Sequence, residues 1–249
     1  EQVNAVNIAI NNPISIITGG PGAGKTTMVK GLVSAVTSLK LKLKLTAPTG
    51  KAATRIATEG LKKYKPSTIH SYLGIFDEKT DVNFDIMIVD ESSMIDIDLM
   101  QSLLTSIPDK SSIVFIGDAD QLPPVGPGQV FKDFIKSKRI EVAQLTGNYR
   151  QDSMSGIAKA ARSIVKGEIP YLKNDLKEDI IFLDLSKENQ AKEILDLYFN
   201  KLPALGINQD DIQILTPQRE GSAGLYNINR LIQQKITARG NPVFTNKVK

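Results

Sequence analysis

One segment near the start of the chain limits what it can fold into more than any other feature. Residues 19–26 read GGPGAGKT and fit the phosphate-binding pattern G-x-x-x-x-G-K-[ST]. An apolar run, Ile14–Thr18, precedes the segment, and a helical pattern from about Lys25 to Leu39 follows it. Glycines let the backbone curl around a phosphate and aim N–H groups inward, and the helix adds the positive end of its dipole. A glycine-rich turn that binds nothing is the alternative, and the strand–loop–helix context argues against it.

The motif gives a role to its individual residues. Lys25 is expected to neutralise the β- and γ-phosphates of ATP, and the Thr26 hydroxyl is expected to bind Mg²⁺. The sequence therefore predicts ATP and Mg²⁺ as cofactors. The residues expected to bind the nucleotide here are Gly20, Pro21, Gly22, Ala23, Gly24, Lys25, Thr26 and Thr27.

A second apolar run ends in two carboxylates. Residues 86–91 read IMIVDE, so Asp90 and Glu91 follow a predicted strand. In a sheet built around a phosphate loop, this strand end faces the phosphates. Asp90 is then expected to hold Mg²⁺ through water, and Glu91 to orient and deprotonate the attacking water. Kinases that transfer phosphate generally need no such Glu, so the pair favours hydrolysis, although an isolated acidic pair is also common in solvated loops.

Charge and composition narrow the class of protein. The net charge is only +4, but residues 81–135 contain 10 Asp and Glu against 2 Lys and Arg. This acidic segment indicates either a metal-binding carboxylate site or an uneven distribution of surface charge. The chain has no Cys and one His, which excludes disulfides, thiol catalysis and a His-rich metal site. The lack of Cys suits a cytoplasmic location. No apolar run approaches the roughly 18 residues of a membrane span, so no membrane contact is expected.

Short apolar runs alternate with amphipathic stretches along the whole chain. This alternation predicts an α/β fold with a parallel sheet that helices cover on both faces. The residues up to Gly147 contain one complete α/β unit, so we expect a domain boundary near Gly147. Further strands are predicted at 41–46, 85–90, 112–117, 142–145, 180–184 and 211–216, and further helices at 50–58, 97–106, 156–166, 189–200 and 223–235.

Two polar residues further along are weaker candidates on their own. Gln121 follows the predicted strand that ends at Gly117, where its amide would reach the γ-phosphate of ATP. Arg150 would stabilise the negative charge that develops during hydrolysis, from a second domain. Taken alone, each is more often an ordinary solvated residue.

Together and in this order, the segments resemble the superfamily 1 DNA helicases of the RecD-like branch. The segments similar to motifs Ia and III are specific to this branch, whereas the phosphate loop alone is not. The resemblance rests on residues 1–6 (Q motif), 19–27 (motif I), 45–56 (LTAPTGKAATRI, motif Ia), 68–70 (TIH), 85–96 (DIMIVDESSMID, motif II), 116–130 (IGDADQLPPVGPGQV, motif III), 145–151 (LTGNYRQ, motif IV) and 214–224 (ILTPQREGSAG).

The resemblance implies a P-loop NTPase with tandem RecA-like parallel sheets flanked by helices. Residues 1–147 would form the first domain with the ATP-binding motifs, and 148–249 an incomplete second domain. ATP would bind between them, and single-stranded DNA would cross both and be moved 5′→3′ in DNA repair or recombination. Other subunits of a helicase–nuclease complex are the further partners that it implies.

The resemblance also implies residue roles beyond the phosphate loop. Gln2 would read the adenine base of ATP. The implied catalytic residues are Lys25, Asp90, Glu91, Gln121 and Arg150, and the implied DNA-binding residues are Pro48, Thr49, Lys51, Arg55, His70, Thr216, Pro217 and Arg219.

Departures from the family pattern leave two alternatives open. The family's motifs V and VI do not occur, so we expect a truncated chain that by itself hydrolyses ATP weakly. The segment between His70 and Asp85 is short where relatives often carry a strand-separating hairpin, which favours translocation over unwinding. The alternatives are the helicase part of a conjugative relaxase and a nucleotide-binding interaction module without productive turnover.

Overall fold

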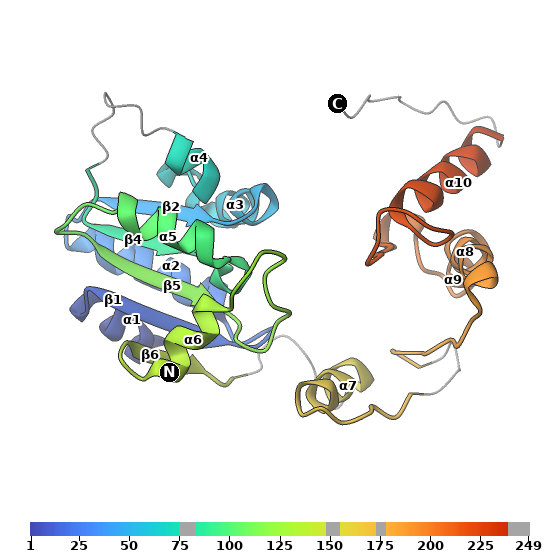
Figure 1. Ribbon diagram of the computed structural model, residues 1–249, viewed down its shortest axis with the longest axis horizontal. Helices are drawn as coiled ribbons and strands as arrows, with labels where there is room; N and C mark the ends of the chain where they lie inside the picture. The colour runs from blue at the N-terminus through green and yellow to red at the C-terminus, as the bar shows by residue number, and fades with distance from the viewer. Residues whose placement is uncertain (75–82, 148–154, 173–177, 239–249) are drawn as a thin grey trace. The chain divides into compact units, whose positions relative to one another are not determined.

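The computed structural model divides the chain into two compact units, Glu1–Tyr171 and Leu172–Lys249, each of which is described by itself (Figure 1). The division between the two units falls after Tyr171. The domain boundary expected near Gly147 stays a prediction, since the residues just after Gly147 are not described. The structure describes residues 1–74, 83–147, 155–172 and 178–238.

The first unit is built on a sheet of six parallel strands in the order β3-β2-β4-β5-β1-β6. The central strands are continuous apolar runs because both faces of a parallel sheet are covered by helices. All four residues of β4 are buried, as are five of the six in β1 and in β5. The strands are β1 (Ile14–Gly19), β2 (Leu43–Ala47), β3 (Ser67–Thr68), β4 (Ile86–Val89), β5 (Ser112–Gly117) and β6 (Glu141–Leu145).

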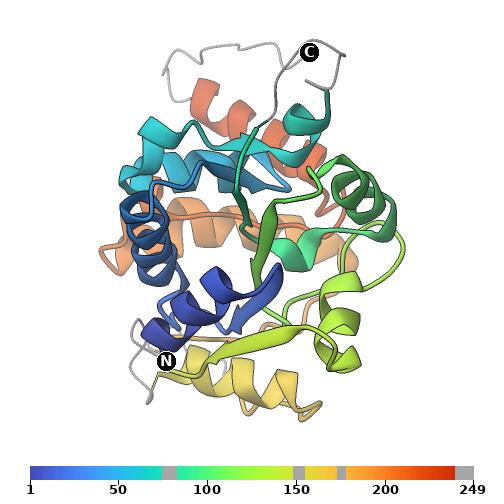
Figure 2. The same cartoon turned by 90° about the vertical axis from the view of Figure 1, so that its left-hand side faces the viewer.

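Helices cover both faces of this sheet, which confirms the predicted α/β fold. Side chains of α1, α2 and α3 pack with one face, and side chains of α4, α5 and α6 pack with the other. The two sets lie on opposite sides of the sheet in Figure 2. The helices of this unit are α1 (Gln2–Asn11), α2 (Lys25–Ser38), α3 (Gly50–Ile56), η1 (Ala57–Leu61), η2 (Lys62–Tyr64), α4 (Ile69–Gly74), η3 (Ser92–Met94), α5 (Ile97–Ser106), α6 (Val130–Ser137) and α7 (Gly156–Val165).

The parallel arrangement decides where functional residues gather. Strands β1, β4 and β5 run in the same direction, so the segments that follow them emerge at one edge of the sheet. These segments are the loop at 20–24 and the residues after Val89 and Gly117. Ligands of open α/β sheets bind at this carboxyl edge.

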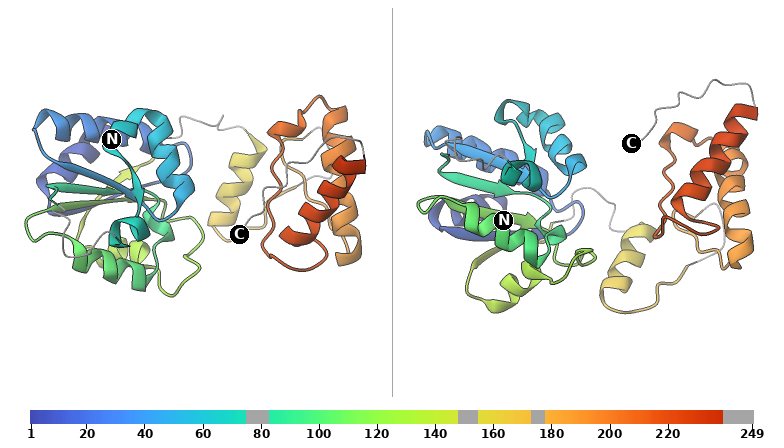
Figure 3. Two further views of the ribbon diagram at one scale, coloured as in Figure 1. Left: turned by 90° about the horizontal axis from the view of Figure 1, so that it is seen from above. Right: turned by 45° about the horizontal axis from the view of Figure 1, so that its top comes forward.

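The described part of the second unit is helical. Helices α8 and α10 lie side by side (Figure 3), and Phe199 and Ile228 are its buried hydrophobic residues within the described range. Its helices are α8 (Lys187–Asp196), η4 (Leu197–Lys201), α9 (Leu202–Ala204), η5 (Gln209–Asp211) and α10 (Leu225–Ala238).

Two predicted strands of the second unit are wrong. Residues 180–184 make only a single-residue bridge at Ile181, and 211–216 are irregular after η5. A strand needs a neighbouring strand to pair its backbone groups, and the described residues of this unit supply none. Phe182 and Leu215 are accordingly 61% and 82% exposed. The second RecA-like sheet stays a prediction.

Candidate nucleotide-binding site

The loop between β1 and α2 has the backbone geometry that its glycines predict. Gly22 and Gly24 have φ angles of 80° and 82°, a region that side chains with a Cβ rarely adopt. A Cβ on Gly19 would lie 2.8 Å from the carbonyl oxygen of Leu145, so a larger residue does not fit there. Gly24 is the N-cap of the 14-residue helix α2, whose free N–H groups and dipole face the loop.

Lys25 lies at the centre of the carboxyl edge. Its Nζ donates to the carbonyl oxygens of Gly19 and Gly20, the latter at 3.1 Å. Burial lowers the pKa of Lys25, and the nearby carboxylates of Asp118, Glu91 and Asp90 oppose this shift in that order. The ammonium therefore lies among three acidic side chains that follow two different strands.

Asp90 and Glu91 are fixed at the end of β4. Asp90 is 6% exposed, and its backbone N–H donates to Thr46 O at 2.9 Å. The Glu91 N–H donates to the Asp90 carboxylate at 2.9 Å. Glu91 itself has a φ of 52°, a left-handed conformation that costs about 1–2 kcal/mol in a residue with a Cβ. Strain of this kind is typical of functional sites, and it aims the Glu91 side chain differently from that of a regular strand residue.

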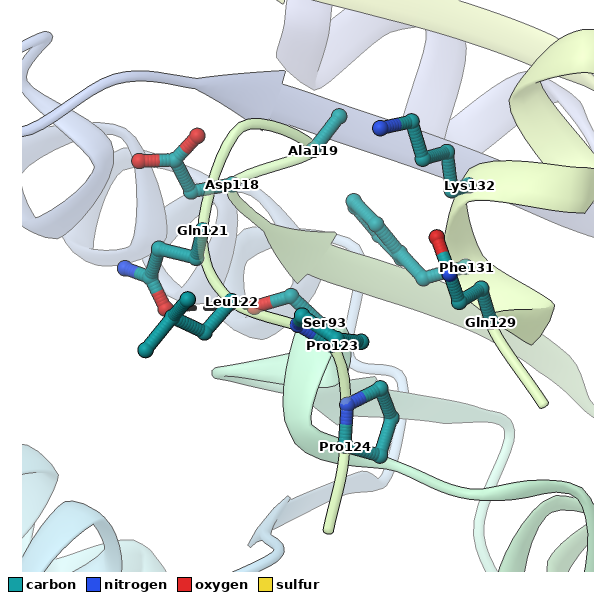
Figure 4. Close-up of a pocket in the computed structure, with 10 residues that line it drawn as sticks. All are labelled: Ser93, Asp118, Ala119, Gln121, Leu122, Pro123, Pro124, Gln129, Phe131 and Lys132. Carbon is teal, nitrogen blue, oxygen red and sulfur yellow. Dashed lines mark hydrogen bonds between the residues drawn. The ribbon is translucent and has the colours of Figure 1, made fainter. Parts of the chain in front are cut away.

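The segment after β5 adds an acidic residue that the sequence analysis missed. Asp118 is 3% exposed, accepts a hydrogen bond from Asp120 N at 3.0 Å, and is the carboxylate that most raises the pKa of Lys25. Its sequence signal is its position directly after an apolar strand, which Asp90 shares. Figure 4 shows Asp118 and Gln121 extending to the same side of their loop.

Gln121 is linked to the segment that follows β4. Its Oε1 accepts a hydrogen bond from Ser93 Oγ at 3.4 Å, and these two residues line one pocket together with Asp118 (Figure 4). Ser93 lies two residues after Glu91, so this hydrogen bond joins the segment after β5 to the segment after β4. Its predicted contact with the γ-phosphate stays a prediction.

Gln2 lies against the phosphate loop although it is distant in sequence. Its Nε2 donates to Gly24 O at 3.5 Å. Glu1, its neighbour, accepts hydrogen bonds from Thr146 N at 2.9 Å and Gly147 N at 3.4 Å. The start of α1 is therefore held between the loop and the end of β6. The contact of Gln2 with adenine stays a prediction.

Comparison with known proteins now supplies the family. The family described as "AAA domain" matches residues 1–181, which is most of the chain. The chain belongs to this AAA domain family. Membership implies nucleotide binding at the loop before α2.

The chain is also similar to named helicases, which confirms the RecD-type resemblance. The ATP-dependent RecD2 DNA helicase of Deinococcus radiodurans is 31% identical over 239 residues, which are 94% of this chain and 32% of that protein. The RecBCD enzyme subunit RecD of Haemophilus influenzae is 28% identical, over 93% of this chain and 50% of that protein. The chain thus spans a third to a half of the length of these two relatives.

Among solved structures, the Pif1 helicase from Candida albicans has the same fold. It superimposes with a TM-score of 0.50 at 22% sequence identity, covering 68% of this chain and 44% of that one. At this identity the match supports the fold of the AAA domain and nothing finer. None of the described helices is long and apolar enough to cross a membrane.

The donor atoms in the AAA domain fit a magnesium ion that arrives with a nucleotide. Mg²⁺ usually keeps several waters and takes one or two protein carboxylates together with substrate phosphates. Thr26 stands in the first turn of α2, and the Asp90 carboxylate stands at the same edge of the sheet. In the described ranges, no three His, Cys, Asp or Glu residues group as a metal site. The assignment of Thr26 and Asp90 as the residues that would hold this ion stays a prediction.

The DNA-binding residues predicted in the AAA domain lie around α3. Thr49 caps α3 by accepting a hydrogen bond from Ala52 N at 3.2 Å, and Pro48 precedes it. Lys51 and His70 are exposed. Arg55 is not a free surface cation, because it is ion-paired with Asp90 and Glu91.

The remaining predicted residues belong to other parts of the chain. In the second unit the Thr216 hydroxyl donates to Gln218 O at 2.9 Å, while Pro217 and Arg219 are exposed. Arg150 lies outside the described residues. The predicted roles of all these residues stay proposals, as does the role of Thr27, which is exposed on α2.

Proposed function

We propose that this chain is the ATP-hydrolysing part of a DNA helicase that moves along single-stranded DNA. One observation carries the proposal: the phosphate-binding loop with Lys25 follows β1, Asp90 and Glu91 follow β4, and Asp118 follows β5. These strands are parallel, so the loop and the three buried or half-buried carboxylates lie at one edge of the sheet. The relatives named RecD2 helicase and RecD subunit support the choice of DNA as the track.

Each residue has a defined task in this proposal. Backbone N–H groups of the loop and the start of α2 bind the phosphates, and Lys25 neutralises their charge. Glu91 orients the attacking water and accepts its proton, while Gln121 contacts the γ-phosphate. Mg²⁺, held by Thr26 and Asp90, supplies further charge neutralisation when it is bound. Gln2 contacts the adenine, and Arg150 stabilises charge in the transition state.

Movement along DNA follows from coupling this site to a DNA surface. The proposed DNA contacts in the first unit are Pro48, Thr49, Lys51, Arg55 and His70. Those proposed in the second unit are Thr216, Pro217 and Arg219. The direction 5′→3′, a cytoplasmic location, a role in repair or recombination, and association with other subunits of a helicase–nuclease complex are part of the same proposal. The direction and the role in repair or recombination rest on the motif resemblance, and the location rests on the lack of Cys. The association with other subunits is supported by the relative named RecBCD enzyme subunit RecD.

Strand displacement on tailed duplexes tests this function. The full-length protein, with ATP and Mg²⁺, is expected to displace the strand from a duplex with a 5′ tail and not from one with a 3′ tail. Lys25→Ala is the control and is expected to abolish displacement. Displacement that persists in Lys25→Ala, or ATP hydrolysis that ignores single-stranded DNA, would contradict the proposal.

A further inference from the structure

Arg55 holds both carboxylates that follow β4. Its Nη2 lies 3.0 Å from Asp90 Oδ2 and 2.9 Å from Glu91 Oε1. The same nitrogen therefore bridges the predicted metal-binding carboxylate and the predicted base. Arg55 reaches them from the last turn of α3, which follows β2, the strand paired with β4.

The bridge joins a reachable cation to two sheltered anions. The Arg55 side chain is 45% exposed, whereas the side chains of Asp90 and Glu91 are 9% and 15% exposed. Burial acts to lower the pKa of Arg55, and the two carboxylates outweigh it, so the net shift is upward. The guanidinium therefore stays charged while part of it remains open to a competing anion from solvent.

This pairing opposes the chemistry that the proposed function requires. The guanidinium occupies Asp90 Oδ2 and Glu91 Oε1, so these carboxylate oxygens are not free to hold a metal ion or an attacking water. Arg55 therefore competes with a metal ion for the Asp90 carboxylate.

The position of Arg55 identifies what could release the restraint. Lys51 lies one helical turn earlier on α3 and is exposed, so both cations project from neighbouring positions of one helix face. Arg presents a planar fork of donors that matches the oxygens of a phosphate, which makes a backbone phosphate of nucleic acid a strong competitor for it.

We propose that Arg55 is a DNA-responsive latch, which restrains Glu91 and Asp90 until a phosphate of single-stranded DNA takes its guanidinium. The latch rests on the proposed function and adds its regulation. ATP hydrolysis then depends on single-stranded DNA, because the Arg55 side chain exchanges the carboxylates of Asp90 and Glu91 for a DNA phosphate. Arg55 thus acts as a positioning residue for Glu91, which would be the catalytic group.

The test compares Arg55→Ala and Arg55→Lys with the unchanged full-length protein. ATP hydrolysis is measured without DNA and with saturating single-stranded DNA. For Arg55→Ala we expect the rate without DNA to rise at least about fivefold, the lower end of coupling between linked sites, while the rate at saturating DNA stays similar. The stimulation by DNA then falls by the same factor. Arg55→Lys, which keeps the charge and loses the fork, is expected to lie between the two.

A second readout does not depend on turnover. Mn²⁺ binding in the presence of a non-hydrolysable ATP analogue is followed by electron paramagnetic resonance. We expect single-stranded DNA to tighten Mn²⁺ binding to the unchanged protein. In Arg55→Ala, binding without DNA is expected to be already tight and insensitive to DNA. Thr54→Ala, an exposed neighbour on α3, is the matched control and is expected to behave like the unchanged protein in both measurements.

The outcomes separate the latch from the function on which it rests. Arg55→Ala with an unchanged rate without DNA and full stimulation overturns the latch. A lower rate without DNA, with nucleotide and Mn²⁺ still bound, also overturns it, because Arg55 would then assist hydrolysis. If the unchanged protein itself shows no stimulation by single-stranded DNA, the proposed function fails, whatever the variants do.

Discussion

The two units of this chain use similar sequence patterns and reach different structures. In the first unit, apolar runs pair into six strands with two buried cores and one edge that collects charged residues. In the second, runs of similar composition at 180–184 and 211–216 form no strand beyond a single-residue bridge at Ile181, and Phe199 and Ile228 are the buried hydrophobic residues among those described. The contrast shows that an apolar run becomes a strand only where partner strands exist. It also assigns the proposed chemistry to the first unit.

The largest expected effect concerns the cores of the two units. Phe115 in β5 is fully buried, so Phe115→Ala should destabilise the first unit by about 3–5 kcal/mol. Phe199, which contacts Tyr198 and Lys235, is 7% exposed in a smaller core, so Phe199→Ala should cost less. Hydrogen exchange under mild denaturant reports on each unit separately. Equal losses of stability in the two variants, or a loss of hydrogen-exchange protection in the first unit of Phe199→Ala, would contradict the difference between the two cores.

Removal of the Lys25 ammonium tests whether the chemistry belongs to the first unit. Lys25→Ala should lower the rate of ATP hydrolysis roughly 10²–10³-fold, because a preorganised charge at the phosphates is lost. Steady-state hydrolysis with single-stranded DNA present measures it. Lys201→Ala, which removes a cation paired with Glu193 and Asp196 in the second unit, is the control and should hydrolyse ATP normally. A similar loss in both variants would contradict the assignment.

Packing at the end of β1 gives a smaller, purely steric test. A Cβ on Gly19 would meet the Leu145 carbonyl, whereas Gly20 has nothing within 4 Å and a normal φ. Gly19→Ala should therefore destabilise the first unit by about 1–3 kcal/mol, and Gly20→Ala should stay within about 0.5 kcal/mol. Urea unfolding compares them. Equal stability of the two variants would mean that β6 does not approach the loop as described.

The smallest expected effect is the loss of one helix cap. Asp96 caps α5 by accepting a hydrogen bond from Leu99 N at 2.9 Å. Asp96→Ala should lower the free energy of unfolding of the first unit by about 1 kcal/mol. Thermal unfolding measures the change, with Gln101→Ala on the exposed face of α5 as the control. Equal unfolding temperatures of the two variants would mean that the Asp96 side chain does not stabilise α5.

Much of the first unit could be predicted from the sequence because its signals are local. The glycine pattern, the apolar runs and the carboxylates after Val89 each specify a short segment, and strand–helix alternation then dictates a parallel sheet. Asp118 escaped although it lies in the segment that resembles motif III, because only Gln121 was assigned a role there. It becomes significant only when β5 is placed beside β1, so that Asp118 lies near Lys25.

Arg55 shows the limit of such predictions most clearly. Its motif implies a DNA contact, and nothing in the sequence says that α3 lies close enough to β4 for an ion pair. The left-handed backbone of Glu91 is equally hidden, since Glu has no preference for it. The second unit could not be predicted well, because its two expected strands depend on pairing that local patterns do not encode.

The central claim is that Glu91 drives an ATP hydrolysis that depends on single-stranded DNA. Hydrolysis by the full-length protein and by Glu91→Gln, each with and without single-stranded DNA, tests it most directly, with nucleotide binding measured in parallel. We expect single-stranded DNA to accelerate ATP hydrolysis by the unchanged protein. We expect Glu91→Gln to bind ATP normally and to hydrolyse it at a rate near zero. Normal turnover in Glu91→Gln, or a rate that DNA does not change, would contradict it.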